Sequence, residues 1–302
     1  VEEERLTRVK SSWGILPVQS MRACLKEGNL SINDIDLIIT PGETYKDIVP
    51  RTKLWVSHHF GYSPEVEAVN HQTAHIASSF FHSGFDEAMC LTYDSTGDAI
   101  SGALAKGSKN KGIEIKETFS INRSLGLFYE TMTSFLGFKP CEDEYKVMGL
   151  AAYGKPNIDL SFFCKETNTG NITDFSYVSD LHFKRSTVYE PKYSSKLVKK
   201  IGNPRLKDGE ITDHYKNIAS SVQFTLEQCA ISNIKYLHSL IKSENLCLSG
   251  GVALNCVANS KIIENKIFKD IWIQPASGDA GGAIGAALCG YHIYKNNKRI
   301  IN

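Results

Sequence analysis

Two histidines that share one helix face have the clearest capacity for chemistry in this chain. His71 and His75 stand four positions apart, and side chains at that spacing lie one above the other on a helix. Two imidazoles placed in this way can bind one metal ion. Asp94 and Asp279 each lie at the end of a predicted strand, close to glycines, and are candidate third and fourth ligands. Mixed imidazole and carboxylate ligation suits Fe2+, Mn2+ or Zn2+, and open coordination positions could take an anionic ligand.

Most helical histidines are ordinary surface or core residues, so the predicted metal site depends on the two aspartates as well. A second histidine pair, His58 and His59, is adjacent in the chain. Adjacent side chains point apart on a helix, and we therefore expect both at the surface.

Two glycine-containing turns point to a cradle for a phosphate or an adenine ring. Ser249-Gly250-Gly251 follows a predicted strand and opens a helix, and residues 278–282 repeat this arrangement after another strand. Glycine lets the backbone approach a ligand closely, and a helix N-terminus favours negative charge. Such turns also occur for structural reasons alone, so it is their combination that indicates a nucleotide site.

The elements that must position these groups follow from hydrophobic periodicity and turn residues. Helices are expected over residues 17–28, 47–60, 71–82, 126–137, 144–152 and 213–242, from the turn at 249–251 through 257, and after the turn at 278–282. Strands are expected over residues 36–40, 88–94, 99–105, 113–120, 245–248 and 271–273. A meander of three strands led by an aspartate is how a ribonuclease-H-like lobe begins. Residues 156–212 lack periodicity and are expected to form a surface insertion or lid.

The composition is typical of a soluble globular protein. The 302 residues are 42% hydrophobic and 22% charged, and the net charge of +1 argues against bulk electrostatic capture of nucleic acid. No apolar run reaches the roughly 18 residues that span a bilayer, and the charged start is unlike a signal peptide. The eight cysteines include no Cys-x-x-Cys pair, which favours reduced thiols and a cytoplasmic protein.

Six segments occur in an order that is characteristic when they are taken together. They are VEEERLTR at 1–8, NHQTAHIASSF at 70–80, DSTGD at 94–98, KVMGLAAYG at 146–154, SGGVALN at 249–255 and SGDAGGA at 277–283. This order resembles the N-terminal domain of the nodulation- and antibiotic-type O-carbamoyltransferases. The resemblance spans nearly the whole chain, and MGLAAYG is its most specific element.

The resemblance implies an α/β fold of the actin/Hsp70 type, in which the active site lies between two ribonuclease-H-like lobes. Residues 1–86 would be the remainder of the first lobe with the metal-binding helix, and residues 87–302 the second lobe with an insertion at about 156–212. The first lobe would lack its initial strands, which carry a Gly…His-Asp motif in the family.

The resemblance also implies an enzyme that transfers a carbamoyl group from carbamoyl-adenylate to a hydroxyl acceptor, assisted by an iron-type metal. The metal ligands would be His71, His75, Asp94 and Asp279. The residues that cradle the adenosine of ATP or carbamoyl-adenylate would be Ser249, Gly250, Gly251, Asn255 and Gly278. The catalytic contacts to phosphate or carbamoyl oxygens would come from Lys10 and Lys146.

Family members usually carry a YrdC-like domain that makes carbamoyl-adenylate from carbamoyl phosphate and ATP, so a YrdC-like domain in the same or another chain is an expected partner. The acceptor would be a sugar, an antibiotic or a polysaccharide precursor. Two alternatives stay open: a tRNA threonylcarbamoyladenosine transferase, which shares the His-x-x-x-His run, and a non-catalytic subunit that binds nucleotide or metal. The near-neutral charge and the MGLAAYG run favour the O-carbamoyltransferase.

Overall fold

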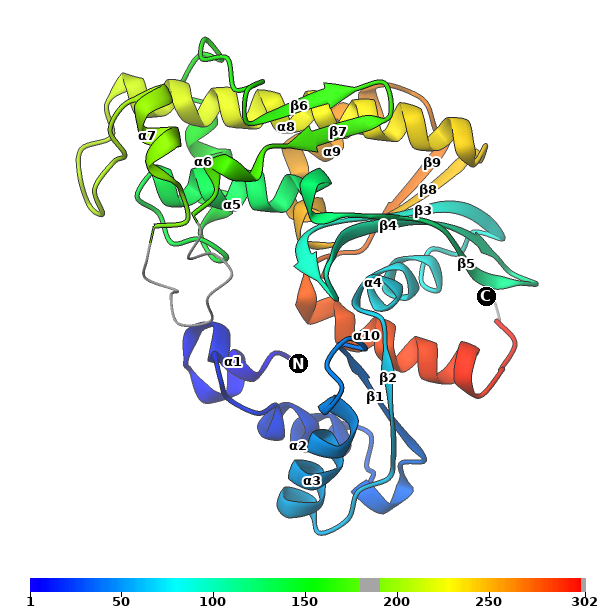
Figure 1. The fold of residues 1–302 in the computed structure, drawn as a ribbon. Helices are drawn as coiled ribbons and strands as arrows, with labels where there is room; N and C mark the ends of the chain where they lie inside the picture. The colour runs from blue at the N-terminus through cyan, green and yellow to red at the C-terminus, as the bar shows by residue number, and fades with distance from the viewer. Residues whose placement is uncertain (180–190, 300–302) are drawn as a thin grey trace.

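A computed structural model describes residues 1–179 and 191–299 and is built around a five-stranded sheet (Figure 1). The strand order is β5-β4-β3-β8-β9. The strands are β3 (Glu87–Gly97), β4 (Ile100–Ser108), β5 (Gly112–Phe119), β8 (Asn245–Ser249) and β9 (Asp270–Ile273). β3 pairs antiparallel with β4 and parallel with β8, so the antiparallel meander and the parallel strands meet at β3.

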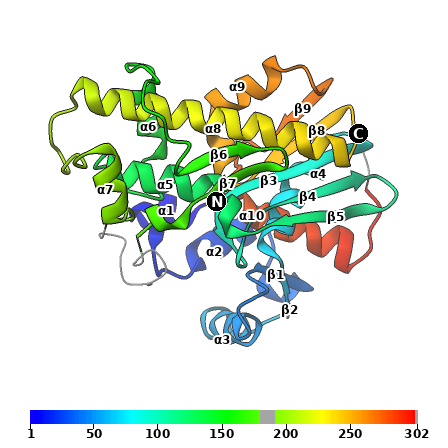
Figure 2. The same ribbon diagram turned by 45° about the horizontal axis from the view of Figure 1, so that its top comes forward.

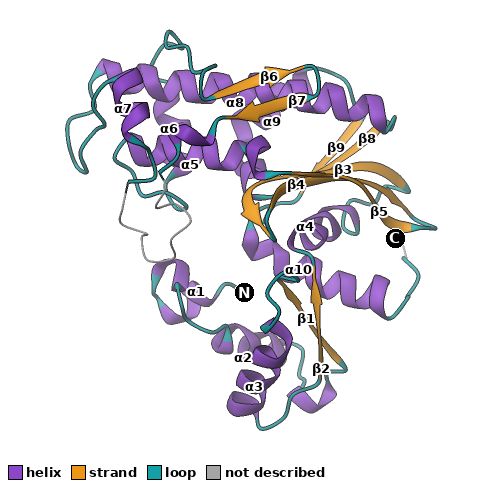
Figure 3. Cartoon of the chain, viewed as in Figure 1, coloured by secondary structure: helices purple, strands orange, loops and turns teal. Residues whose placement is uncertain are grey.

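Helices lie on both sides of this sheet (Figure 3). The helices among the described residues are α1 (Glu3–Thr7), α2 (Val18–Glu27), α3 (Ile48–Phe60), α4 (His71–Phe80), α5 (Leu125–Phe135), α6 (Glu144–Ala151), α7 (Ser195–Ile201), α8 (Asp213–Leu240), α9 (Cys256–Glu264) and α10 (Asp279–Cys289). Among the described residues, no helix is long and apolar enough to cross a membrane.

Side chains alternate along β3 and so divide the core into two layers. Met89 and Leu91 belong to the larger core cluster, which includes buried residues of α5 and α8. Ala88 and Cys90 belong to a separate cluster with Ile76 of α4. The central strand is therefore buried on both faces, and α4 is held against the sheet by its apolar side.

A second, smaller sheet lies at the opposite end of the molecule from α8 (Figure 2). It consists of the parallel strands β1 (Leu37–Pro41) and β2 (Glu65–Val69). α10 packs against both β1 and α4, while α4 packs on β3 and β8 of the main sheet. These two helices therefore join the two sheets, and the predicted domain boundary between residues 86 and 87 stays a prediction.

The contact between α4 and α10 depends on a glycine. A Cβ at Gly285 would lie 1.7 Å from the carbonyl oxygen of Ala74, which no side chain can tolerate. Small residues such as Ala77 and Ala286 complete the interface. The small-residue composition of the last helix thus lets it approach the helix that carries the histidines.

Most expected elements are confirmed, with local differences. β2 has no counterpart among the expected strands. The helix expected to run through Val257 is wrong, because Gly251–Leu254 form a 3-10 turn and α9 begins at Cys256. The segment 156–212 contains regular structure: the hairpin of β6 (Cys164–Thr167) and β7 (Gly170–Thr173), and also α7. Residues 180–190 of this segment lie outside the described residues.

Candidate metal centre

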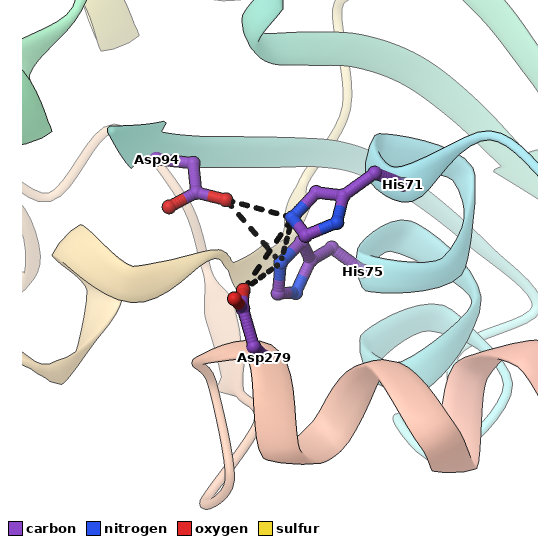
Figure 4. Close-up of side chains that lie close together, drawn as sticks. All are labelled: His71, His75, Asp94 and Asp279. Atoms are coloured by element: carbon purple, nitrogen blue, oxygen red, sulfur yellow. Dashed lines mark hydrogen bonds and ion pairs between the residues drawn. The ribbon is translucent and has the colours of Figure 1, made fainter. Parts of the chain in front are cut away.

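Four side chains from three elements converge on one point (Figure 4). His71 and His75 come from the start of α4, Asp94 from β3, and Asp279 from the first position of α10. One potential ligand atom of each residue lies within 4.8 Å of those of the other three. The structure thus brings together all the side chains that the sequence singles out as metal ligands.

The spacing of the donor atoms fits a single ion. His71 Nε2 lies 2.9 Å from Asp94 Oδ2, 3.0 Å from His75 Nε2 and 3.4 Å from Asp279 Oδ1. His75 Nε2 lies 3.5 Å and 3.4 Å from the same two carboxylate oxygens. Ligand atoms about 2.0–2.2 Å from a metal stand roughly 3 Å from one another in a common coordination sphere. These separations match that arrangement.

Hydrogen bonds alone do not satisfy this arrangement. Each Nε2 faces a carboxylate and so must carry a proton to make a hydrogen bond. Two N–H groups that are 3.0 Å apart oppose each other rather than bond. A cation that is bound through the lone pairs of all four groups removes this conflict, so the donor set of His71, His75, Asp94 and Asp279 fits a divalent metal.

The charges of the four groups depend on one another. Burial lowers the pKa of His71, but hydrogen bonds to Asp279 and Asp94 raise it to about 10. The pKa of His75 is also raised, since the two carboxylates outweigh the opposing effect of burial. Burial raises the pKa of Asp94, yet hydrogen bonds from both histidines bring it below its usual value. Hydrogen bonds from the same histidines lower the pKa of Asp279.

The cluster is open on one side. The side chain of His75 is completely buried, whereas that of Asp279 is 79% exposed. Asp94 and His71 lie between these extremes. A ligand can therefore approach the cluster from the side of Asp279, while β3 and α4 close the opposite side.

Neighbouring residues fix the helix that carries the histidines. The side chain of Asn70 accepts hydrogen bonds from the backbone at the start of α4. The hydroxyl of Ser249, which is buried, donates to the carbonyl oxygen of His75 at 2.8 Å. Gly97 packs directly on the ring of His71, where a Cβ would lie 2.2 Å from Cδ2.

The first predicted glycine turn lies beside this cluster and contacts the segment before α10. The second turn, expected over 278–282, is wrong beyond Gly278, because α10 begins at Asp279. The backbone N–H of Gly250 donates to the carbonyl oxygen of Ser277 at 2.9 Å. Gly250 has φ of +91°, and a Cβ there would lie 2.2 Å from the carbonyl oxygen of Tyr93, so only glycine fits. A Cβ on Gly251 would lie 3.3 Å from Asp94 Oδ1. The first turn therefore passes next to a candidate metal ligand.

The other two predicted nucleotide-binding residues, Asn255 and Gly278, lie against other parts of the protein. Asn255 is buried, caps α9 by accepting from the N–H of Ala258, and exchanges two hydrogen bonds with Gln223. Gly278 precedes α10, and a Cβ there would lie 3.5 Å from Leu254. The role of these residues in nucleotide binding stays a prediction.

Lys10 and Lys146 belong to a different cluster, the Glu142 network. We use this name for the ion pairs among Lys10, Lys139, Lys146, Glu142 and Asp143. Lys10 Nζ lies 3.3 Å from Glu142 Oε2 and 4.0 Å from Asp143 Oδ1, and Lys146 Nζ lies 2.8 Å from Asp143 Oδ1. Lys139 also pairs with Glu142. The two lysines share a carboxylate partner, and their contacts to a ligand stay a prediction.

Asp98 is not among the site residues that we predict from the sequence. It stands in the same DSTGD run as Asp94, and its carboxylate accepts a hydrogen bond from the backbone N–H of His71 at 2.7 Å. Its place in the DSTGD segment, between the strands expected at 88–94 and 99–105, is the sequence signal that could have drawn attention to it.

The fold is shared with solved structures of low sequence identity. HypF from T. kodakarensis aligns with a TM-score of 0.52 at 14% identity and covers 94% of this chain and 44% of that protein. Component A of the (R)-2-hydroxyglutaryl-CoA dehydratase from Acidaminococcus fermentans aligns with a TM-score of 0.50 at 14% identity, covering 95% and 86%. The chain thus has an actin-like α/β fold, which confirms the predicted fold class.

The sequence comparisons define the family within this fold. A family model described as "Carbamoyltransferase N-terminus" matches residues 49–288, which include all four candidate metal ligands but not Lys10. The nodulation protein NolNO of Sinorhizobium fredii is 34% identical over 312 residues, which cover 95% of this chain and 43% of NolNO. The chain belongs to the carbamoyltransferase family, as the resemblance predicts. It spans about half the length of the curated relatives that it matches.

Proposed function

We propose that this chain transfers a carbamoyl group from carbamoyl-adenylate to a hydroxyl of a small-molecule or saccharide acceptor. The hydroxyl oxygen attacks the carbamoyl carbon, the bond from this carbon to the phosphate oxygen breaks, and AMP and a proton are released. The observation that supports this most strongly is the convergence of two histidines and two aspartates beside a glycine turn, in a member of the carbamoyltransferase family.

The four converging residues would hold a divalent cation, with Fe2+ as our first choice and Mn2+ or Zn2+ as alternatives. When bound, such an ion withdraws electron density from a carbamoyl or phosphate oxygen. Buried His75 and Asp94 would fix the ion against α4 and β3. Exposed Asp279 would complete the site on the side from which the anionic donor enters.

The glycine turns would bind the adenylate part of the donor. Gly250 and Gly251 bring backbone close to Asp94, so a phosphate held there would adjoin the metal ligands. Ser249 and Asn255 would act chiefly by holding the turn in shape, because their side chains already bond within the protein. Gly278 would let the start of α10 approach the same ligand.

Lys10 and Lys146 would contact phosphate or carbamoyl oxygens by exchanging their carboxylate partners for the ligand. Both Nζ atoms lie near Asp143 Oδ1, and both side chains are substantially exposed. A YrdC-like domain, in the same protein or in another chain, would supply carbamoyl-adenylate. The acceptor would be a hydroxyl of a sugar, an antibiotic or a polysaccharide precursor.

The proposal is tested by reconstituting the reaction. The chain is mixed under anaerobic conditions with Fe2+, carbamoyl phosphate, ATP and a separate YrdC-like protein, and a panel of sugars, antibiotics and oligosaccharides is screened by mass spectrometry. We expect a carbamoylated hydroxyl compound and stoichiometric AMP. Products on tRNA alone would favour the threonylcarbamoyladenosine transferase instead, and no product with any acceptor would contradict the proposed transfer.

Two histidine variants test whether the transfer depends on the metal site and not simply on the loss of any histidine. His71→Ala should abolish the product, because it removes a metal ligand. His58→Ala is the matched control, since His58 is an exposed histidine of α3 and should leave the reaction unchanged.

A further inference from the structure

The turn between β3 and β4 is short, and its backbone has an unfavourable conformation for residues other than glycine. Gly97 pairs with Ile100, so the loop consists of Asp98 and Ala99 only. Their φ angles are +52° and +64°, the left-handed pattern of a type I′ hairpin turn. Alanine rarely adopts this conformation, and residues held in it cluster at functional sites. The turn therefore holds Asp98 in one defined orientation.

The carboxylate of Asp98 is the meeting point of three segments. It accepts hydrogen bonds from the backbone N–H of His71 at 2.7 Å, of Glu43 at 3.2 Å and of Thr44 at 3.1 Å. The hydroxyl of Thr44 donates to it at 2.7 Å. These donors lie at the start of α4 and in the loop that follows β1. One side chain of the main sheet thus ties a loop of the small sheet to a candidate metal ligand.

The same turn holds His71 in a second way. A Cβ on Gly97 would overlap the imidazole of His71, so the ring rests directly on the backbone of the turn. The ordinary capping of α4 falls to a different residue, because Asn70 accepts from the N–H groups of Gln72 and Thr73. Asn70 thus satisfies two of the free N–H groups of α4, and Asp98 accepts from a further one, that of His71, which fixes the position of this residue.

We propose that Asp98 is a positioning residue for the metal centre, which holds His71 in place and couples metal binding to the order of Glu43 and Thr44. This inference rests on the metal site of the proposed function. Glu43 and Thr44 are exposed, so their amides exchange readily with solvent unless Asp98 accepts from them. An ion that fixes His71 will also fix Asp98 and, through it, these two amides.

The test compares Mn2+ affinity, measured by isothermal titration calorimetry, across the wild-type chain and three variants. Asp98→Ala should weaken Mn2+ binding by about 10- to 100-fold, the usual effect of removing a group that orients a ligand. Asp98→Asn keeps the shape and one acceptor oxygen, and should lose less, about 3- to 10-fold, which is below the range for complete removal of the group. Thr44→Val is the matched control: it removes only the hydroxyl donor, leaves the bond from His71, and should bind Mn2+ as the wild type does.

Amide hydrogen exchange distinguishes the positioning role of Asp98 from a purely structural one, because only the positioning role makes exchange at Glu43 and Thr44 depend on Mn2+. Mn2+ should slow exchange at Glu43 and Thr44 in the wild type and leave it unchanged in Asp98→Ala, with folding verified by circular dichroism. If Asp98→Ala does not fold, Asp98→Asn carries both measurements. Wild-type affinity in the folded Asp98 variants would overturn the positioning role alone. Failure of the wild-type chain to bind Mn2+ would overturn the metal site, and the positioning role with it.

Discussion

The His–Asp cluster and the Glu142 network differ in how their charges are balanced. In the Glu142 network each lysine faces a carboxylate, and Glu142, with only 3% of its side chain exposed, pairs with Lys10 and Lys139. In the His–Asp cluster, the cationic partners that Asp94 and Asp279 find among the described residues are two imidazoles, whose charge depends on bound protons. The first arrangement is complete as a structural link, whereas the second is completed by protons or by a metal ion.

The two regions also differ in what they connect. The Glu142 network joins the N-terminal segment to the residues before α6, through exposed Lys10 and buried Glu142. The His–Asp cluster joins α4, β3 and α10, the elements on which the two sheets meet. Damage to the cluster should therefore abolish metal binding, while damage to the network should leave metal binding intact and cost modest stability.

The largest effect is expected from His75→Ala. His75 is completely buried and its Nε2 faces the other three ligand atoms, so its removal takes away one of the four donor atoms. We expect Mn2+ affinity to fall by more than about 100-fold, beyond the range for residues that only orient a ligand. Equilibrium dialysis measures this, and affinity within threefold of the wild type would mean that the ion binds elsewhere.

The next largest effect is expected at the contact between α10 and α4. Gly285→Ala places a Cβ 1.7 Å from the carbonyl oxygen of Ala74 and must push α10, with Asp279, away from α4. We expect the free energy of unfolding to fall by about 3 kcal/mol, with weaker Mn2+ binding. Gly282→Ala is the matched control, because a Cβ there meets nothing within 4 Å. Alanine is more favourable than glycine in a helix by about 0.5–1 kcal/mol, so this variant should be as stable as the wild type or more stable. Urea unfolding measures this, and equal free energies of unfolding for the two variants would contradict the close contact between α10 and α4.

A smaller and pH-dependent effect is expected from Glu142→Gln. Burial raises the pKa of Glu142, but hydrogen bonds from Lys139, Ser11 and Lys10 lower it to about 2. Because the folded-state pKa lies below the unfolded value, the carboxylate stabilises the protein above about pH 4.5, and this stabilisation is lost as the pH falls toward 2. The melting temperatures of the variant and the wild type should differ near neutral pH and converge near pH 2. A difference that is constant with pH, or an altered Mn2+ affinity, would refute this separation of the two regions.

The smallest effect is expected from Lys10→Ala. Lys10 is 62% exposed, and an ion pair at such a position contributes less than about 1 kcal/mol. We expect thermal unfolding to change little, while kcat/KM for the carbamoyl donor falls if Lys10 contacts it as proposed. Unchanged kinetics would remove Lys10 from the site, and a large loss of stability would show that the network is more than a surface link.

The parts of this structure that follow from local sequence could be predicted. The spacing of His71 and His75 on an amphipathic segment is enough to place both on one helix face. The strands at 88–94 and 99–105 are marked by apolar runs that are bounded by glycine and aspartate. The four candidate ligands were also predictable as a set, since each stands at the end of a strand or the start of a helix.

Features that depend on distant residues could not be predicted. Asp98 acquires its role from donors at Glu43, Thr44 and His71, which are far from it in the chain. From the sequence, the side chains of Ser249 and Asn255 are expected to bind a ligand. In the fold they form hydrogen bonds to His75 and to Gln223, respectively. The carboxylate partners of Lys10 lie more than a hundred residues away, at 142 and 143.

The central claim is that His71, His75, Asp94 and Asp279 hold one divalent ion. Anomalous diffraction from crystals grown with Mn2+ tests it most directly. We predict a single strong Mn2+ peak about 2.1 Å from the Nε2 atoms of both histidines and from one oxygen of each aspartate. The claim would be contradicted by crystals that show the four side chains ordered and hydrogen-bonded to one another in excess Mn2+, with no peak between them.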